Sequence, residues 1–199
     1  MDKLDELINC INKRKEGRDS TAATYRDSND LSALAELSSK ENNLSRRYDV
    51  LEFISTQYES MGRFSVAALY RFEALKIAKG LNKDIEGMLY TLLRDRNYYV
   101  DDDSDDVKEV VNDLLPKEII DKRFEDIKRH RRSLKHDPIE MSKEYLDCID
   151  EVEEKIEQNR TYRGLGSYHE IWNLKFRFLL EKGIKWKSPA VLNPRVMFD

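Results

Sequence analysis

Apolar residues recur at intervals of three and four along most of the chain, and this spacing is the strongest constraint on its fold. In the first such segment, residues 2–15, Leu4, Leu7, Ile8 and Ile11 form a single apolar stripe along a helix. A helix of this kind buries its apolar stripe against a neighbour. The same periodicity predicts a short helical segment over residues 31–37 and further helices over the ranges 64–79, 85–100, 105–114, 119–134, 138–158 and 168–182. Ser38 and Glu41 resemble a capping box, and the helical pattern continues from there to residue 61.

Residues that interrupt helices are scarce in this sequence. The 199 residues include only 7 Gly and 4 Pro, whereas a fold of many short strands needs frequent turns. The chain is 40% hydrophobic, which is enough for a chain of this length to form a core without metal ions or disulfides. We therefore expect an all-α fold of seven to eight helices, packed as antiparallel hairpins or as a bundle.

The C-terminal segment, residues 184–199, differs from the helical part of the chain. It contains Pro189 and Pro194, which interrupt helices, yet it is rich in apolar residues. A segment of this composition is too apolar for a free tail, so we expect it to be extended and packed on the helices. Trp186 has two interpretations: its indole closes one end of the bundle, or it is an exposed anchor for a partner.

An acidic run, residues 101–106, interrupts the helical pattern near the middle of the chain. We expect one helical domain over residues 1–199. The acidic run would mark a subdivision into a layer of helical hairpins, residues 1–100, and a second helical layer that includes the C-terminal segment, residues 104–199.

The sequence lacks the motifs of common metal and cofactor sites. The three histidines, His130, His136 and His169, do not have the spacing of zinc ligands, and no Gly-rich phosphate loop is present. The acidic run alternates aspartates as a calcium loop does, but Asp106 stands where such a loop needs Gly and Asn112 where it needs Glu. We therefore expect no metal site and no cofactor, and a non-catalytic protein rather than an enzyme.

Composition also bears on where the protein acts. No segment approaches the roughly 20 consecutive apolar residues of a membrane span, and the N-terminus is acidic, without the apolar stretch of a signal peptide. The two cysteines, Cys10 and Cys148, are too few for a disulfide scaffold. We expect a cytoplasmic protein that does not associate with membranes, and the mild net charge of -4 leaves room for a local basic patch.

In residues 48–81, large side chains occupy the first of two expected helices, Gly and an aromatic residue occupy the turn, and small residues occupy the second helix. These residues are Leu51, Ile54, Tyr58, Gly62, Phe64, Ala67, Ala74 and Leu75. The pattern resembles a single tetratricopeptide repeat, a 34-residue helical hairpin used in protein–protein recognition. A helical hairpin within a bundle fits the same pattern. If the hairpin lines a binding groove, we expect a concave apolar surface with Tyr58, Tyr70 or Trp186 partly exposed.

Basic residues cluster around the end of the helix expected at 119–134. They are Lys122, Arg123, Lys128, Arg129, Arg131, Arg132 and Lys135. Such a cluster fits the phosphates of RNA or an acidic protein partner, with Arg129, Arg131, Arg132 and His136 as the candidate binding residues. A solvated helix face, or cations that complement the C-terminal end of their own helix, fits it as well.

Within this cluster, four residues separate Arg131 from His136. This spacing is similar to the Arg–His signature of HEPN domains, which are helical ribonucleases and nucleotide-handling proteins. The resemblance implies that His136 acts as a general acid or base at an RNA 2′-hydroxyl. It also implies that Arg131 stabilises negative charge on the scissile phosphate.

Our leading hypothesis from the sequence is a non-catalytic interaction protein. Its binding surface would be a groove at the hairpin of residues 48–81, or the basic face at residues 128–135, and it would recognise a peptide or protein. One alternative is an RNA-directed protein that binds through the arginine cluster or cleaves through Arg131 and His136. A second alternative is a structural homo-oligomer.

Overall fold

The computed structural model describes residues 2–16, 25–96, 105–129, 134–162 and 166–198. These residues contain ten α-helices and one short 3₁₀-helix, and no strand. The expectation of an all-α fold is therefore confirmed. The chain divides into two compact units, residues 1–96 with 102–130, and residues 97–101 with 131–199. The first two helices that follow the acidic run, over residues 105–129, thus belong to the N-terminal unit.

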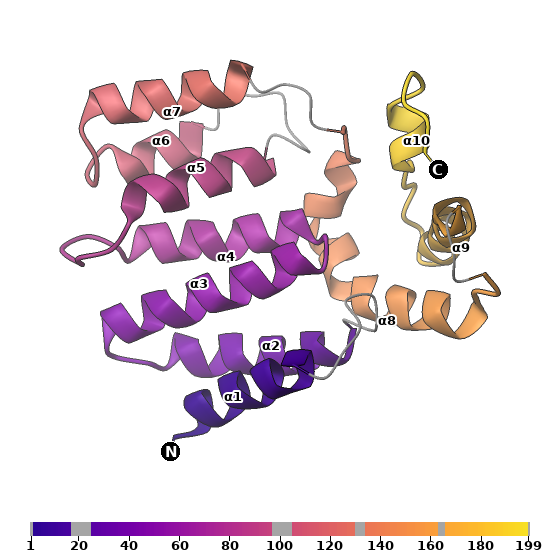
Figure 1. Cartoon of the computed structure of the whole chain (residues 1–199), viewed down its shortest axis with the longest axis horizontal. Coiled ribbons are helices and arrows are strands. Elements are labelled where there is room, and N and C mark those ends of the chain that lie inside the picture. The colour runs from indigo at the N-terminus through magenta and orange to yellow at the C-terminus, as the bar shows by residue number, and fades with distance from the viewer. Residues whose placement is uncertain (1, 17–24, 97–104, 130–133, 163–165, 199) are drawn as a thin grey trace. The chain divides into compact units, whose positions relative to one another are not determined.

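The N-terminal unit is a stack in which successive helices from α1 to α5 pack side by side (Figure 1). At its far end α6 packs on α4, and α7 packs on α5. The helices of this unit are α1 (Lys3–Glu16), α2 (Tyr25–Ser39), α3 (Leu44–Ser60), α4 (Phe64–Lys76), α5 (Ile85–Arg96), α6 (Asp105–Val111) and α7 (Lys117–Arg129).

The hairpin of α3 and α4 forms the centre of this stack. Its second helix approaches the first closely because Ala67, Ala68 and Ala74 are buried and small. Gly62 allows the tight turn, since its φ of +72° lies in the left-handed region that glycine adopts without strain. The two helices contribute to both apolar clusters of the unit, one with α1 and α2 and the other with α5, α6 and α7.

The structure contains two helices within the helical pattern of residues 31–61, but the second one does not begin at the capping box expected at Ser38 and Glu41. The first helix, α2, begins at Tyr25 and ends at Ser39, and α3 begins at Leu44. The division occurs at Asn43, whose side chain accepts a hydrogen bond from the backbone N–H of Arg46 and caps α3. The earlier start of α2 was missed because its first turns contain polar residues, of which Asp27 and Ser28 are buried.

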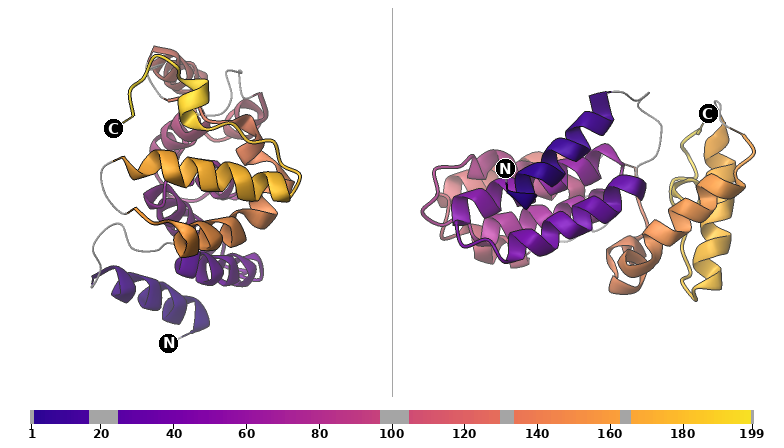
Figure 2. Two further views of the ribbon diagram at one scale, coloured as in Figure 1. Left: turned by 90° about the vertical axis from the view of Figure 1, so that its right-hand side faces the viewer. Right: turned by 90° about the horizontal axis from the view of Figure 1, so that it is seen from below.

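The C-terminal unit consists of the antiparallel pair α8 (Lys143–Asn159) and α9 (Ser167–Glu181), preceded by the 3₁₀-helix η1 (Pro138–Met141). The helix expected over residues 138–158 is interrupted, because the Ser142 side chain accepts a hydrogen bond from the N–H of Tyr145 and starts α8 anew. After α9 the chain reverses and returns through the short helix α10 (Pro189–Leu192) (Figure 2).

The returning segment is fastened to residues 135–140, as expected for a packed C-terminal segment. The Asn193 side chain accepts from the N–H of Lys135 at 2.9 Å and donates to its carbonyl at 2.8 Å. The buried indole of Trp186 donates from Nε1 to Oε1 of the buried Glu140, at 2.6 Å. His136 lies on the other side of this carboxylate, with Nδ1 at 3.8 Å from Oε2.

Ala67→Leu tests the close packing of α3 and α4. Because Ala67 is fully buried, we expect the added volume to force the helices apart and to lower the free energy of unfolding by about 1–3 kcal/mol. Urea unfolding followed by circular dichroism measures the change. Glu73→Leu on the exposed side of α4 is the control, and an equal loss of stability in both variants would contradict close packing at Ala67.

Glu140→Gln tests the fastening of the C-terminal segment. Burial raises the pKa of Glu140, but Lys175, His136 and Trp186 together outweigh burial, so the net pKa is lowered. A carboxyl with a lowered pKa in the folded state stabilises the fold above its unfolded pKa, and this contribution disappears as the pH falls through the folded value. At neutral pH the variant should therefore be less stable by about 1–3 kcal/mol, and the difference should shrink at acidic pH.

Unfolding followed by tryptophan fluorescence at a series of pH values measures this dependence. Glu144→Gln, at an exposed position of α8, is the matched control and should leave the pH profile unchanged. A stability difference between wild type and Glu140→Gln that stays constant from neutral to acidic pH would show that the charge of Glu140 does not hold the segment.

Candidate binding groove between α3, α4 and α5

A cavity of about 340 Å³ opens on one face of the N-terminal unit, between α3, α4 and α5. Its size is at the lower end of the range for small-ligand pockets. Charged and polar side chains provide most of its lining. The lining residues are Glu52, Thr56, Glu59, Arg71, Asp84, Gly87, Met88, Thr91 and Arg94.

Helical spacing brings these residues together. Glu52, Thr56 and Glu59 follow one another at intervals of four and three, so they share a face of α3. Gly87, Thr91 and Arg94 have the same intervals on α5. The face of each helix toward the cavity is thus polar, while other faces of α3 and α5 enter the apolar core.

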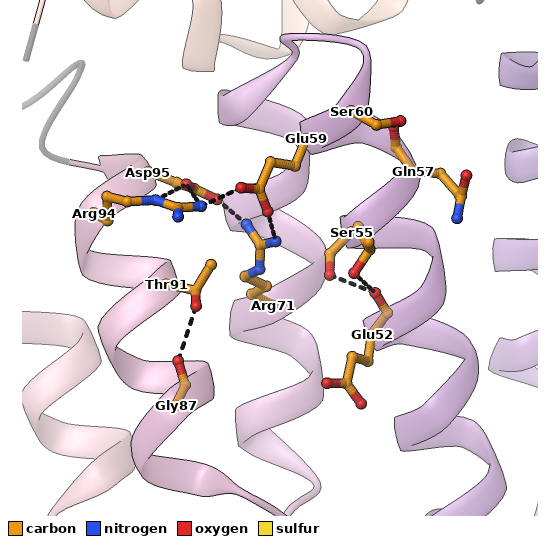
Figure 3. Close-up of polar contacts among 11 residues, drawn as sticks. Glu52, Ser55, Gln57, Glu59, Ser60, Arg71, Gly87, Thr91, Arg94 and Asp95 are labelled. Carbon is orange, nitrogen blue, oxygen red and sulfur yellow. Dashed lines mark hydrogen bonds and ion pairs between the residues drawn. The ribbon is translucent and has the colours of Figure 1, made fainter. Parts of the chain in front are cut away.

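The floor of the groove is an ion-pair network that joins the three helices (Figure 3). The Arg71 guanidinium pairs with Asp95 through one terminal nitrogen and with Glu59 through the other. Arg94 pairs with Glu59 and donates to Oδ1 of Asp95 from Nε at 3.3 Å and from Nη2 at 3.1 Å. Two cations thus match two carboxylates.

Burial sets this network apart from surface ion pairs. The side chain of Arg71 is 4% exposed and that of Asp95 is fully buried. Burial lowers the pKa of Arg71, and its pairing with Glu59 acts in the opposite direction. Loss of either member would leave an uncompensated charge in the core, which is strongly destabilising.

The rim toward the start of α5 is negative. Among the described residues neither Glu52 nor Asp84 forms an ion pair, whereas nearby Lys83 pairs with Asp49 at 2.5 Å. Burial, together with the charges of Glu52, Asp84 and Asp49, raises the pKa of Tyr48, so these carboxylates act on a common region.

Asp84 also caps α5. Its Oδ1 accepts from the N–H of Gly87 at 2.9 Å. A Cβ at position 87 would lie 2.2 Å from Oδ2 of Asp84, so the glycine makes room for this carboxylate.

Tyr58, Tyr70 and Trp186, the aromatic candidates for a groove, do not line this cavity, although Tyr70 is partly exposed. Tyr58 is buried and stacks on the half-buried Tyr70 at a centroid distance of 5.7 Å, and neither ring lines the cavity. Trp186 belongs to the core of the C-terminal unit, with its side chain 2% exposed, so its indole is not available to a partner in this structure. The groove is consequently polar rather than aromatic.

Of the candidate RNA-binding residues, the structure describes Arg129 and His136. Arg131 and Arg132 lie outside the described residues. Arg129 is exposed on α7 and pairs with Glu125 at 3.0 Å. His136 is placed beside Glu140 in the C-terminal unit, and its role with Arg131 stays a prediction.

The residues that the structure describes contain neither a candidate metal site nor a candidate membrane span. They contain no group of three or more His, Cys, Asp or Glu side chains arranged to hold a metal ion. Asp101 and Asp103 of the alternating acidic run lie outside this set. No described helix has the length and apolar character required to cross a membrane.

Sequence reasoning missed the Arg71–Asp95 pair, although a signal for it exists. Arg71 falls at the buried positions of α4, between Ala67 and Ala74, where a charged residue is unexpected. Asp95 likewise follows the buried Leu92 on α5. Charged residues on apolar faces are almost never fully buried unless they are paired, so the two anomalies together point to a pair.

Arg71→Met tests this pairing. We expect a loss of about 3–5 kcal/mol of unfolding free energy, because Asp95 stays buried without its main counter-charge. Asp95→Asn alone should also destabilise the fold. The double variant should be more stable than the sum of the single effects implies, by about 0.5–3 kcal/mol. Urea unfolding of the four proteins gives this coupling, and additive effects would contradict a buried pair.

Comparison of the chain with protein-family models, with curated proteins and with solved structures finds no match. A functional argument therefore rests on the geometry of the groove and on the charges that line it.

Proposed function

We propose that this protein is a non-catalytic interaction protein that binds a short segment of a partner protein in the groove between α3 and α5. The observation that carries this proposal is the cavity itself, which lies at the helical hairpin that resembles a tetratricopeptide repeat. A rigid, ion-paired floor supports it from three helices. Side chains held in this way lose little freedom on binding, which favours affinity.

The chemistry of the lining favours binding over catalysis. The cavity is lined by no His, Cys or Ser side chain. Its two hydroxyl groups donate to backbone carbonyls, Thr56 to Glu52 at 3.0 Å and Thr91 to Gly87 at 2.9 Å, so neither is positioned against a general base. Cys10 and Cys148 are free thiols, which supports our proposal of a cytoplasmic setting.

The alternatives have weaker support in the described residues. In the basic segment, Arg123 pairs with Glu86 and Asp126, and Arg129 pairs with Glu125, so these two cations already have partners. A homo-oligomer would draw on exposed apolar side chains of α9, which include Tyr168, Phe176 and Leu180. Nothing in the structure indicates what covers this face.

Selection from a displayed library of random seven-residue peptides tests the groove. We expect enriched peptides to bind wild type and to lose at least about tenfold in affinity with Thr56→Trp, because the indole would fill the cavity from the exposed side of α3. Asp121→Trp, on the exposed side of α7, is the control and should bind as wild type does. Unfolding curves of both variants verify that they are folded.

The peptide selection and an RNA assay together separate the proposed function from the alternatives. If no peptide distinguishes wild type from Thr56→Trp, the groove is not a peptide site and the proposal is wrong. Salt-sensitive binding or cleavage of a mixed RNA pool that is lost in Arg131→Ala and His136→Ala would instead favour the RNA-directed function.

A further inference from the structure

We infer that the groove between α3 and α5 takes a cationic side chain of the partner segment, with arginine preferred over lysine. This inference rests on the proposed function and specifies the partner that the groove fits. The hydrogen-bonding polarity of the lining and its unbalanced charge support it independently.

The polar groups of the cavity are mostly acceptors toward an occupant. The hydroxyl hydrogens of Thr56 and Thr91 are committed to the carbonyls of Glu52 and Gly87, so their oxygens can only accept. The N–H of Gly87 is committed to Asp84. The carboxylates of Glu52, Glu59 and Asp84 are acceptors when ionised. An occupant that satisfies this lining must therefore supply hydrogen-bond donors.

About half of the N–H groups of the two guanidiniums are used within the floor. The terminal nitrogens of Arg71 meet Asp95 and Glu59, and Nε and Nη2 of Arg94 meet Asp95 and Glu59. Nη1 of Arg94 forms none of these bonds, and it can donate to a backbone carbonyl of the bound segment. Nη1 carries two N–H groups, so the floor keeps donors for the main chain of a bound peptide.

The charge of the lining also favours a cation. Arg71 and Arg94 are balanced by Glu59 and the adjacent Asp95, whereas Glu52 and Asp84 have no ion-pair partner among the described residues. These two carboxylates would repel an anionic occupant. The N-terminal end of α5, which would otherwise attract an anion, is already capped by Asp84.

Arginine fits these acceptors better than lysine does. Its guanidinium presents five donors in a planar fork, so it can serve a carboxylate and a threonine oxygen at once. Met88 provides an apolar contact in the cavity for the methylene stem of such a side chain. The ammonium of lysine offers only three donors from a single point.

Two charge-neutralising variants test the inference on the peptides enriched against wild type. Glu52→Gln removes one charge, and Asp84→Asn removes the other while asparagine keeps the capping function. We expect each to weaken binding about threefold, and the double variant about tenfold, as exposed ion pairs of moderate strength allow. Glu118→Gln, on the exposed side of α7, should have no effect.

Replacement of arginine by citrulline in the enriched peptides is the complementary test, because citrulline keeps the shape and loses the charge. The inference predicts that enriched peptides share an arginine, that citrulline at that position weakens binding to wild type, and that it has little further effect in the double variant. Affinity for wild type should also fall as salt rises.

The outcomes separate the inference from the function on which it rests. Peptides that bind wild type but not Thr56→Trp, and that contain no basic residue or ignore Glu52→Gln and Asp84→Asn, would uphold the groove and overturn the cationic occupant. Enrichment of acidic peptides would overturn it as well. If no peptide distinguishes wild type from Thr56→Trp, both proposals fail together.

Discussion

The guanidinium of Arg71 is a charge placed inside an apolar core, and the arrangement of α3, α4 and α5 depends on how that charge is satisfied. Its partners come from the two neighbouring helices, Glu59 from α3 and Asp95 from α5. Apolar packing alone tolerates small slips of one helix along another, whereas a buried ion pair fixes their register because an unpaired charge is so unfavourable there. The same contacts that position the helices also form the floor of the groove.

The C-terminal unit also depends on a buried charged residue that contacts elements distant in the sequence. Residues 184–198 contain little regular structure, so few backbone hydrogen bonds hold them in place. The buried carboxylate of Glu140 compensates, because it accepts from Trp186 and is stabilised by Lys175 and His136. In each unit a buried acidic residue, Asp95 or Glu140, thus contacts an element that is distant in the sequence, and apolar side chains surround the contact.

Contacts between residues that are distant in the sequence explain which features of the structure could not be predicted. Periodicity locates most of the helices and the alanine-lined hairpin, because each depends on residues close together in the chain. It does not reveal that α3 begins after Asn43 rather than at the capping box expected at Ser38, or that Ser142 begins α8, since several polar residues in each segment could cap a helix. The groove was expected at the hairpin, yet its charged lining was not. The pairing of Arg71 with Asp95, 24 residues away, is a tertiary contact, and the sequence indicates it only through the two charged residues that interrupt apolar helix faces.

A polar groove above a buried ion-pair network has a consequence for specificity. An apolar groove accepts many side chains of similar size, because it discriminates only by volume. In this groove the acceptor groups penalise any occupant that does not supply donors, since the unpaired polar atoms would be desolvated without compensation. The floor cannot rearrange to help, because Arg71 and Asp95 are already committed to each other. The selectivity for a donor-rich cation that we propose would therefore follow from the same pairing that keeps the three helices in register.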